Sequence, residues 1–375
     1  MKKILIIYAS AGNGHKKAAE AVYKEFLRIK DPNIEAMPID SLNYTTRFFK
    51  FSYKRVYIIL IKYLPWLWGF FYHILNNRFF YQIAKPFRFV VNRLNSKRLQ
   101  EFLVKENFDA VISTHFFATD VISRLKGKGI LSLPLINIIT DFEFHLYWLA
   151  KNVDKYIVTA DFVKQEAVER GIAQDKILVY GVPIRKEFTA NIAKSVARES
   201  LGLDNDKFTI LIMGGGLGVG PLKEIVVDMQ SLIFDCQIIV VCGHNKRLLS
   251  ELKAAKGNFK KQVQLVGFSH NMDLIMAASN IMVSKTGALT VAESLSRELP
   301  IINISPIPGQ EMGNLKFLLG EGVGFKLKSI IGLKAKIEEF YEMTKASGAL
   351  KTKIGKLSRP HAASDIVKLT LEMIR

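Results

Sequence analysis

The stretch SAGNGHKKAAEA, residues 10–21, follows directly on the apolar run Ile4–Ile7 and leads into a helical pattern. Its two glycines allow a tight turn between a strand and a helix. The motif differs from the dinucleotide fingerprint G-x-G-x-x-G, because Lys17 stands where the third glycine belongs. His15 occupies the amino end of the expected helix, where the helix dipole favours the neutral imidazole that a general base needs. Capping or packing in the turn is the alternative role for His15.

Short apolar runs alternate with helical stretches along the whole chain, which is typical of parallel α/β units. Six strands are expected before a polar segment at 184–206 that we interpret as a linker: Lys3–Tyr8, Ile34–Ile39, Asp109–Ser113, Pro134–Ile139, Tyr156–Thr159 and Lys176–Val179. Five are expected after it: Thr209–Met213, Ile238–Val241, Val263–Val266, Ile281–Val283 and Ile301–Ile304. Two successive doubly wound domains predict a cleft between them, with ligands at the carboxyl ends of both sheets. A last helix is expected within Ala362–Arg375.

Basic and aromatic residues are concentrated in one segment. The chain has 375 residues and a net charge of +19, which favours an anionic partner. Residues 41–100 contain no Asp or Glu, but 11 Lys and Arg and 17 of the 40 aromatic residues. We expect this insert to lie in the membrane interface, with its apolar side chains in the acyl boundary and its cations on anionic headgroups. The candidate membrane residues are Arg47, Lys54, Arg55, Lys62, Trp66, Trp68, Phe70 and Phe71.

Other interpretations of the insert are weaker. Residues 56–75 have transmembrane length, but Lys62 and Pro65 lie near the middle and basic residues flank both ends. Nucleic-acid binding is disfavoured because the aliphatic content is too high for a stacking platform. An ordinary buried helical insert is the remaining alternative.

The cysteines and histidines exclude two kinds of site. Cys236 and Cys242 lie about 20 Å apart in an expected strand, too far for a disulfide, and indicate buried thiols in a reducing compartment. The seven histidines show no metal-ligand spacing. The first apolar run is also too short for a cleavable signal peptide.

Three motifs in the second half carry groups that suit an anion, a ribose and sugar hydroxyls. MGGGLGVGP, 213–221, brings backbone N–H groups to an anion at a helix start, although it lacks the lysine of a P-loop. Glu293 in VSKTGALTVAES, 283–294, can accept both hydroxyls of a ribose. The polar residues of SPIPGQEMGN, 305–314, suit sugar hydroxyls. A flexible loop, a solvated helix face and helix capping are the respective alternatives.

These motifs in this order resemble glycosyltransferase family 28, in the branch of monogalactosyldiacylglycerol synthases and processive diacylglycerol glucosyltransferases. The matching pieces span about residues 4–320 and are SAGNGHKKAAEA, ITDFEFHLYWLAKNVDKYIV, GVPIRKEF, MGGGLGVGP, VCGHN, VGFSHNM, SKTGALTVAES and PGQEMGN. The resemblance implies the GT-B architecture, with two Rossmann-like domains and a carboxyl-terminal helix that crosses back to the first. An acceptor and membrane domain would span 1–187, a UDP-sugar domain 200–355 and the crossing helix 360–375.

The resemblance also implies roles for particular residues. On the donor side it would place Gly214, Gly215, Gly216, Leu217 and Gly218 at the diphosphate, Phe268 at the uracil, Glu293 at the ribose, and Gln310 with Glu311 at the sugar, with Thr286, Gly287 and Asn314 beside them. His15 would be the base at the acceptor hydroxyl, with Asp141 as a second candidate. Gly14, His145 and Trp148 would line the acceptor side.

We therefore expect an inverting transferase that moves glucose or galactose from a UDP-sugar to diacylglycerol, peripherally bound at the cytoplasmic face of the cell membrane. No metal or other cofactor and no nucleic acid are expected. One alternative is a transferase for a polyprenyl-linked cell-wall precursor, against which the stretch with Asp141, His145 and Trp148 argues. A soluble UDP-sugar epimerase would have no use for the insert. A non-enzymatic membrane-surface or nucleic-acid binding module would not need the intact donor motifs.

Overall fold

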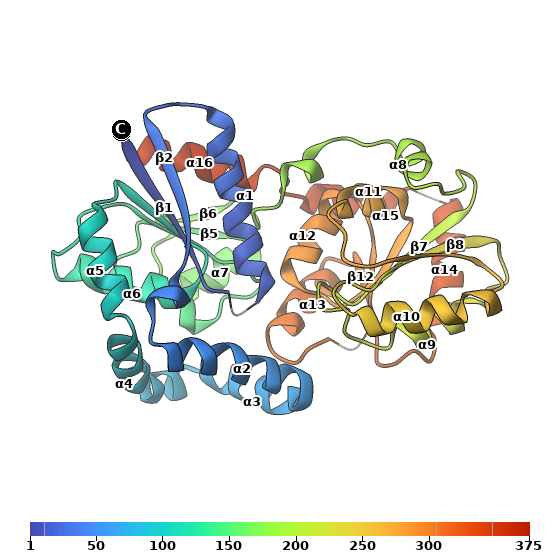
Figure 1. Ribbon diagram of the computed structural model, residues 1–375, viewed down its shortest axis with the longest axis horizontal. Coiled ribbons are helices and arrows are strands. Elements are labelled where there is room, and N and C mark those ends of the chain that lie inside the picture. The colour runs from blue at the N-terminus through green and yellow to red at the C-terminus, as the bar shows by residue number, and fades with distance from the viewer. Residues whose placement is uncertain (11, 305, 347) are drawn as a thin grey trace. The chain divides into compact units, whose positions relative to one another are not determined.

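The structure is a computed structural model that describes residues 1–375 except Ala11, Ser305 and Ser347 (Figure 1). The chain forms two compact units: unit 1 contains Met1–Lys186, Ile307–Gly313 and Arg359–Arg375, and unit 2 contains Glu187–Pro306 and Asn314–Ser358. Each unit contains a six-stranded sheet, and each neighbouring pair of strands that the structure describes is parallel. The predicted α/β class is therefore confirmed.

The sheet of unit 1 has the strand order β2-β1-β3-β4-β5-β6. Its strands are β1 (Lys2–Tyr8), β2 (Ile34–Asp40), β3 (Ala110–Ser113), β4 (Leu135–Ile138), β5 (Lys155–Val158) and β6 (Ile177–Val179). The helices that cover it are α1 (Asn13–Ile29), α5 (Lys97–Glu106), α6 (Phe116–Gly127), α7 (Asp161–Glu169) and α16 (Ala362–Met373), and short 3-10 turns lie at η1 (Ser41–Tyr44), η2 (Leu146–Trp148) and η3 (Gln174–Lys176).

The apolar residues of β1 alternate between two cores, because successive side chains of a strand point to opposite faces. Leu5 and Ile7 pack in the core that includes residues of α5, α6 and α7, whereas Ile4 and Ile6 pack in the core that includes residues of α1 and α16. The last helix thus belongs to unit 1, which confirms the expected crossing back of the carboxyl-terminal helix.

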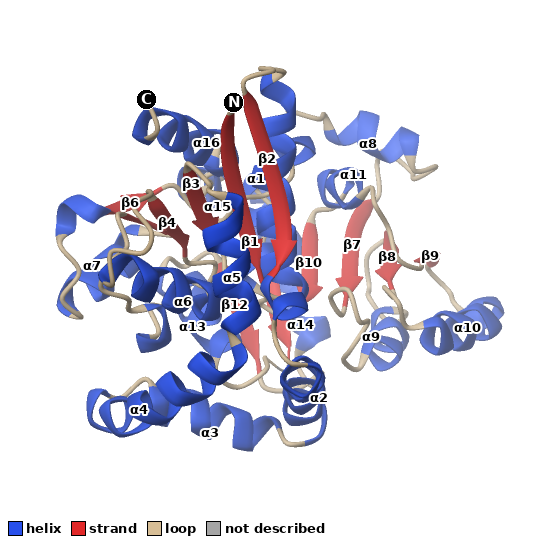
Figure 2. Ribbon diagram, turned by 60° about the vertical axis from the view of Figure 1, so that its left-hand side comes forward, coloured by secondary structure: helices blue, strands red, loops and turns tan. Residues whose placement is uncertain are grey.

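The basic aromatic insert forms three helices, α2 (Arg47–Tyr63), α3 (Pro65–Leu75) and α4 (Arg78–Asn95). Pro65 begins α3, where its missing N–H costs nothing, and so separates α3 from α2. Figures 1 and 2 both show these helices beyond the carboxyl ends of β1 and β2. Within the described residues no single helix is long and apolar enough to cross a membrane, and one bent pair, Arg47–Ile61 with Pro65–Leu75, passes that test by length and composition only.

The sheet of unit 2 has the strand order β12-β11-β10-β7-β8-β9. Its strands are β7 (Phe208–Met213), β8 (Cys236–Val241), β9 (Gln262–Val266), β10 (Ile281–Ser284), β11 (Ile301–Ile304) and β12 (Gly324–Leu327). The helices are α8 (Lys194–Ser200), α9 (Leu222–Met229), α10 (Lys246–Ala255), α11 (Met272–Ala278), α12 (Ala288–Ser296), α13 (Gln310–Gly320), α14 (Leu333–Ala346) and α15 (Ala349–Leu357), with 3-10 turns η4 (Lys186–Thr189) and η5 (Lys256–Asn258). The first four residues of α13 belong to unit 1. One core contains Phe208, Ile210 and Ile212 of β7 with residues of α9, α10 and α14.

Two elements differ from the expectation. The segment 184–206, expected as a linker, contains η4 and α8. Helix α8 is held in place by Arg198, whose buried guanidinium donates to the carbonyls of Ala278 and Asn205. Strand β12 was not expected, since its sequence GFKL is short and only half apolar. Cys236 and Cys242 are buried free thiols, as expected.

Candidate functional site

Unit 1 has a topological switch point between β1 and β3. From β1 the chain crosses to β2 on one side of it and then returns to β3 on the other. Ligands of open α/β sheets bind at such a point, outside the carboxyl ends of the strands. His15 follows β1, His115 follows β3, and Thr140 with Asp141 follows β4. Four polar residues that follow three neighbouring strands therefore lie at this edge.

His15 is the third residue of α1, and hydrogen bonds hold it from two sides. Nδ1 lies 3.2 Å from Oγ1 of Thr140, and the backbone carbonyl accepts a hydrogen bond from Oγ1 of Thr114 at 3.0 Å. Burial lowers the pKa of His15 to about 4, so the ring is neutral at physiological pH. His15 is only half-buried, and a Cβ built on the neighbouring Gly14 would meet nothing within 4 Å. A neutral imidazole can accept a proton from a bound hydroxyl group.

Two more aromatic rings border His15. The ring of His115 meets it edge-on, with centroids 4.9 Å apart, and the ring of Trp148 lies at 5.9 Å. Sequence reasoning missed His115. Its place directly after a buried strand, on the same sheet edge as His15, was the available signal.

Asp141, the second candidate base, has a pKa raised to about 7, because burial and then the charges of Glu143 and Glu311 disfavour its carboxylate. Its backbone carbonyl accepts a hydrogen bond from Oγ1 of Thr159. A carboxyl group with this pKa is half ionised near neutral pH. The geometry thus keeps Asp141 as an alternative to His15.

His145 and Trp148, expected on the acceptor side, are both buried. Nδ1 of His145 accepts the N–H of Tyr147 at 3.1 Å, so its Nε2–H donates to the carbonyl of Tyr72 at 3.0 Å. Because backbone groups use both ring nitrogens, His145 fastens α3 to the loop after β4. The buried ring of Trp148 lies beside that of His15 and so borders the site.

The loop Ile307–Gly313 lies in unit 1, although its residues were expected in the second domain. It packs closely on α3, because a Cβ on Gly69 would come within 2.5 Å of Pro308, and a Cβ on Gly309 within 3.2 Å of Trp68 Nε1. Trp68, expected at the membrane, is therefore half-buried against this loop.

Two expected sugar-binding residues open α13 at the end of the same loop. Glu311 is buried, and its Oε2 accepts the N–H of Ile307 at 2.8 Å. The side chain of Glu311 thus supports the loop that precedes α13, whereas Gln310 lies beside it, half-buried.

In unit 2 the switch point lies between β7 and β10, and the glycine loop follows β7. Several of its glycines are required by packing. A Cβ on Gly218 would lie 2.0 Å from the carbonyl oxygen of Cys242, and a Cβ on Gly243 would lie 2.4 Å from that of Gly216. The N–H of Gly218 donates to the carbonyl of Gly215 at 3.0 Å. The loops after β7 and β8 therefore interlock, and the N–H of Gly218 is used in a hydrogen bond within the turn.

The loop after β8 also supports Phe268, the residue that is expected at the uracil ring. Phe268 is 43% exposed and stacks on the ring of His244, with centroids 4.3 Å apart and planes 13° from parallel. The N–H of His244 donates to the carbonyl of Gly216. The loop is part of the motif VCGHN, which contributes to the family resemblance, but the sequence did not predict a role for His244. The contacts connect the glycine loop directly to the aromatic ring that is expected at the uracil.

The other donor residues follow β10. Thr286 is buried and accepts from Nδ2 of Asn303 at 3.2 Å, while its carbonyl accepts from Nδ2 of Asn314 at 2.9 Å. These residues support the turn at Gly287, at which α12 begins. Glu293 lies on α12 and is half-buried. Thr286 and Asn314 thus act beneath the turn, and Leu217, 54% exposed, lies on the surface of the glycine loop.

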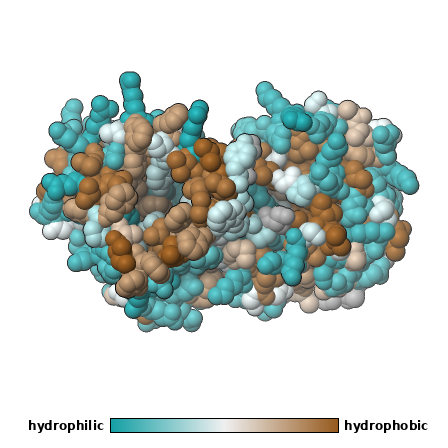
Figure 3. All heavy atoms as spheres, turned by 90° about the horizontal axis from the view of Figure 1, so that it is seen from below, coloured by the Kyte–Doolittle hydropathy of each residue, from teal (hydrophilic) through white to brown (hydrophobic). Residues whose placement is uncertain are grey.

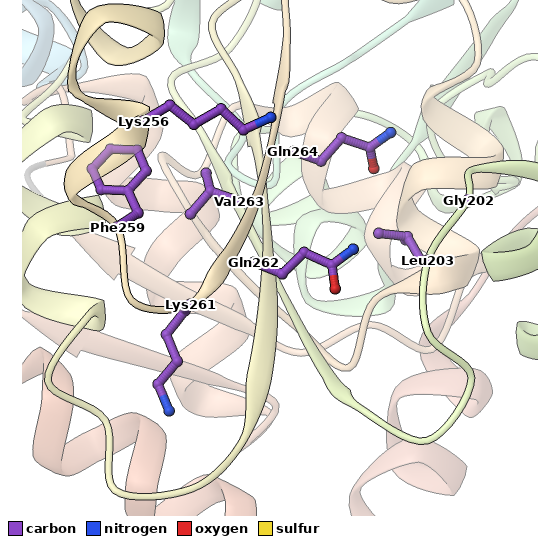
Figure 4. A pocket seen from close by; sticks show the side chains of 8 residues that line it. All are labelled: Gly202, Leu203, Lys256, Phe259, Lys261, Gln262, Val263 and Gln264. Atoms are coloured by element: carbon purple, nitrogen blue, oxygen red, sulfur yellow. The ribbon is translucent and has the colours of Figure 1, made fainter.

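A further pocket of unit 2, with a volume of about 360 Å³, lies at the amino-terminal half of β9 (Figure 4). It is lined by Gly202, Leu203, Lys256, Phe259, Lys261, Gln262, Val263 and Gln264. Its place is remote from the carboxyl strand ends at which nucleotides bind in such sheets. We therefore do not include it in the donor site. Among the described residues, no group of three or more His, Cys, Asp and Glu side chains could hold a metal ion.

The helices α2–α4 present large apolar side chains to solvent. Figure 3 shows apolar surface on the face that these helices form, and its exposed residues include Phe48, Phe51, Trp66, Phe70, Phe71, Phe79 and Phe87. Arg47 and Arg55 are exposed among them. The side chains of Lys54 and Lys62 lie outside the described part of the chain. Apart from the half-buried Trp68, the candidate membrane residues that are described are therefore exposed on α2 and α3.

Comparison with known proteins identifies relatives for both halves. Residues 15–184 match the family model described as monogalactosyldiacylglycerol (MGDG) synthase, and residues 209–317 match the glycosyltransferase family 28 C-terminal domain. The processive diacylglycerol beta-glucosyltransferase of Bacillus cytotoxicus is 29% identical over 373 residues, covering 99% of this chain and 93% of the relative. The Bacillus pumilus protein of the same name is 29% identical over 380 residues, covering 99% and 95%. The predicted family resemblance is confirmed.

Solved structures share the fold. MurG of Acinetobacter baumannii aligns with a TM-score of 0.65 at 16% identity, covering 100% of both chains. HepE of Anabaena, solved in complex with UDP-glucose, aligns with a TM-score of 0.56 at 14% identity, covering 99% of this chain and 100% of the other. These likenesses confirm the predicted GT-B fold.

Proposed function

Because the chain belongs to glycosyltransferase family 28, we propose that it transfers a hexose from a UDP-sugar to diacylglycerol at a membrane surface. The observation that carries this proposal lies in unit 1. There, a neutral and half-buried His15 lies at the switch point, and Figures 1 and 2 show the helices of the exposed apolar surface beyond the same end of the sheet. A base near a membrane-facing surface suits a lipid hydroxyl as the acceptor.

In the proposed reaction the acceptor oxygen attacks the anomeric carbon from the side opposite UDP. His15 takes the hydroxyl proton as the new C–O bond forms, and the bond to UDP breaks with its electron pair on the departing diphosphate. The backbone dipoles of the glycine loop and the start of α9 offset the charge of that leaving group. The configuration at the anomeric carbon inverts. No metal ion or other cofactor is part of the proposal.

Glucose is the proposed sugar, because the relatives that match nearly the whole chain are named glucosyltransferases. Galactose is the alternative, since the family model for the amino-terminal half carries the name of a galactolipid synthase. We also propose that the protein acts at the cytoplasmic face of the cell membrane, on anionic lipids, without a nucleic-acid partner. The exposed Arg47 and Arg55 among aromatic side chains support an anionic surface.

The test is transfer of radiolabelled sugar from UDP-glucose or UDP-galactose to vesicles that contain diacylglycerol. The lipid product is extracted, separated by thin-layer chromatography and identified by mass spectrometry. A glycosyldiacylglycerol from UDP-glucose would support the proposal, and a product from UDP-galactose would correct the sugar. Parallel vesicles that contain a polyprenyl-linked sugar acceptor provide the comparison. Transfer to that acceptor alone would overturn the proposed substrate.

A further inference from the structure

Three side chains of unit 1 lie in a row that leads from the insert to the proposed base. Oη of Tyr53, on α2, lies 3.5 Å from Nε2 of His115. The ring of His115 meets the ring of His15 edge-on, at an angle of 87°. His115 is fully buried, so its ring contacts only protein.

The backbone and one ring nitrogen hold His115 in place. Its Nδ1 accepts the N–H of Phe117 at 3.2 Å and so caps α6. Its carbonyl accepts hydrogen bonds from the hydroxyls of Ser113 and Thr119, at 3.1 and 3.2 Å. Because Nδ1 is an acceptor, the neutral ring carries its proton on Nε2, the nitrogen that faces Tyr53. Neither nitrogen remains for a substrate proton, and any effect of His115 on the reaction passes through His15.

The helix that carries Tyr53 has two different faces. Phe49 and Tyr53 lie one turn apart and pack on the start of α6, with the ring of Phe49 5.6 Å from that of Phe117. Phe48 and Phe51 are exposed, with the guanidinium of Arg55 4.5 Å above the ring of Phe51. One face of α2 thus belongs to the exposed apolar surface, and the other contacts the cap residue beside His15.

We infer that His115 is a positioning residue for His15, and that Tyr53 joins it to α2 so that docking of α2 on a membrane sets the orientation of the base. This inference rests on the proposed function and adds a link between lipid binding and the reaction. A capping role alone accounts for Nδ1 of His115. It does not account for the edge-on contact with His15 or for the approach of Tyr53 Oη.

The kinetic test uses His115→Asn, which removes the ring but keeps a strong capping side chain, and Tyr53→Phe, which removes one oxygen. Tyr44→Phe is the matched control, because Tyr44 packs on the ring of Phe102 just as Tyr53 packs on the ring of Phe49. With diacylglycerol vesicles, His115→Asn should lower kcat roughly 10- to 100-fold, as expected for a misplaced catalytic group, with an unchanged KM for UDP-glucose. Tyr53→Phe should lower kcat by a smaller factor, and Tyr44→Phe should not. Wild-type kcat in His115→Asn would overturn the inference.

A second measurement does not depend on sugar transfer. In protein labelled with ¹⁵N at its seven histidines, the ring nitrogens of His15 are observed by NMR. Phosphatidylglycerol vesicles should shift the His15 signals of the wild type but not those of Tyr53→Phe, and His115→Asn should shift them without vesicles. Unchanged His15 signals in His115→Asn, or a full vesicle response in Tyr53→Phe, would contradict the link even if one variant were unstable. Absence of transfer by the wild type would instead contradict the proposed function.

Discussion

Nδ1 of His15 lies 3.2 Å from Oγ1 of Thr140, so that residues after two different strands of one sheet share a hydrogen bond. A hydroxyl can accept the Nδ1–H of a neutral imidazole. That arrangement leaves the lone pair on Nε2, the form in which His15 can take a proton from an acceptor hydroxyl. Thr140 is buried, and its position is therefore defined by the protein rather than by solvent.

Replacement of His15 by alanine should lower turnover by about 10²–10⁴, the usual contribution of a positioned general base. Binding of UDP should not change, because His15 belongs to unit 1 and the proposed nucleotide groups belong to unit 2. Turnover is measured with diacylglycerol vesicles, and UDP binding by calorimetry. Near-wild-type turnover in this variant would transfer the role of base to Asp141.

The pH dependence of kcat/KM should distinguish the two candidate bases. A base acts when deprotonated, so activity falls as the pH drops through its pKa. With His15 as the base, whose pKa is lowered to about 4, activity should stay nearly constant from pH 8 to pH 6. With Asp141, whose pKa is raised to about 7, it should fall roughly tenfold over the same interval. We expect the first profile, and Asp141→Asn should leave its shape unaltered.

Glu293→Ala should weaken UDP binding by about 1.5–3 kcal/mol, the usual contribution of hydrogen bonds to a charged group. The physical reason is the proposed contact of its carboxylate with the ribose hydroxyls. Glu298→Ala is a suitable control, since Glu298 follows the same helix α12 and is exposed. Calorimetry that returned equal UDP affinities for wild type and Glu293→Ala would exclude this residue from the donor site.

Gly218→Ala should destabilise unit 2 far more than Gly215→Ala. Both glycines have positive φ, 60° and 69°, so both substitutions strain the backbone. Only at Gly218 would the new Cβ also collide with a backbone carbonyl, that of Cys242, whereas at Gly215 it meets nothing within 4 Å. We expect about 1–2 kcal/mol for Gly215→Ala and at least roughly 2 kcal/mol more for Gly218→Ala. Denaturant unfolding measures the difference, and equal losses would show that the two loops do not interlock.

Trp66→Ala should weaken binding to anionic vesicles, whereas Trp68→Ala should affect it much less. The side chain of Trp66 is exposed on the apolar surface, and that of Trp68 is half-buried beside Gly309. Loss of one large apolar side chain from the interface should cost about 1.5 kcal/mol, roughly tenfold in affinity. Vesicle sedimentation measures both variants. High salt or an alkaline wash should release the wild type, and retention under both conditions would indicate a spanning segment.

Much of the architecture could be predicted from local patterns. The runs Ile4–Ile7 of β1 and Ile210–Met213 of β7 are continuously apolar and lead into glycine turns. This is the typical sequence pattern of parallel strands that are buried on both faces. Strand β12 and helix α8 escaped prediction, because GFKL is a weak strand pattern and α8 depends on the distant partners of Arg198.

The sequence by itself determined the two α/β units, the family, and the position of His15 at a strand-to-helix turn, since these depend on periodicity and on short motifs. Only the tertiary structure decided which groups surround His15. His115 and Thr140 lie 100 and 125 positions further along the chain, and they meet His15 because β3 lies beside β1, with β4 next to β3. The same holds for Trp68, whose inward position follows from the contact between α3 and the loop at Gly309. Such contacts depend on the strand order and on the packing of helices, which no local pattern in the sequence encodes.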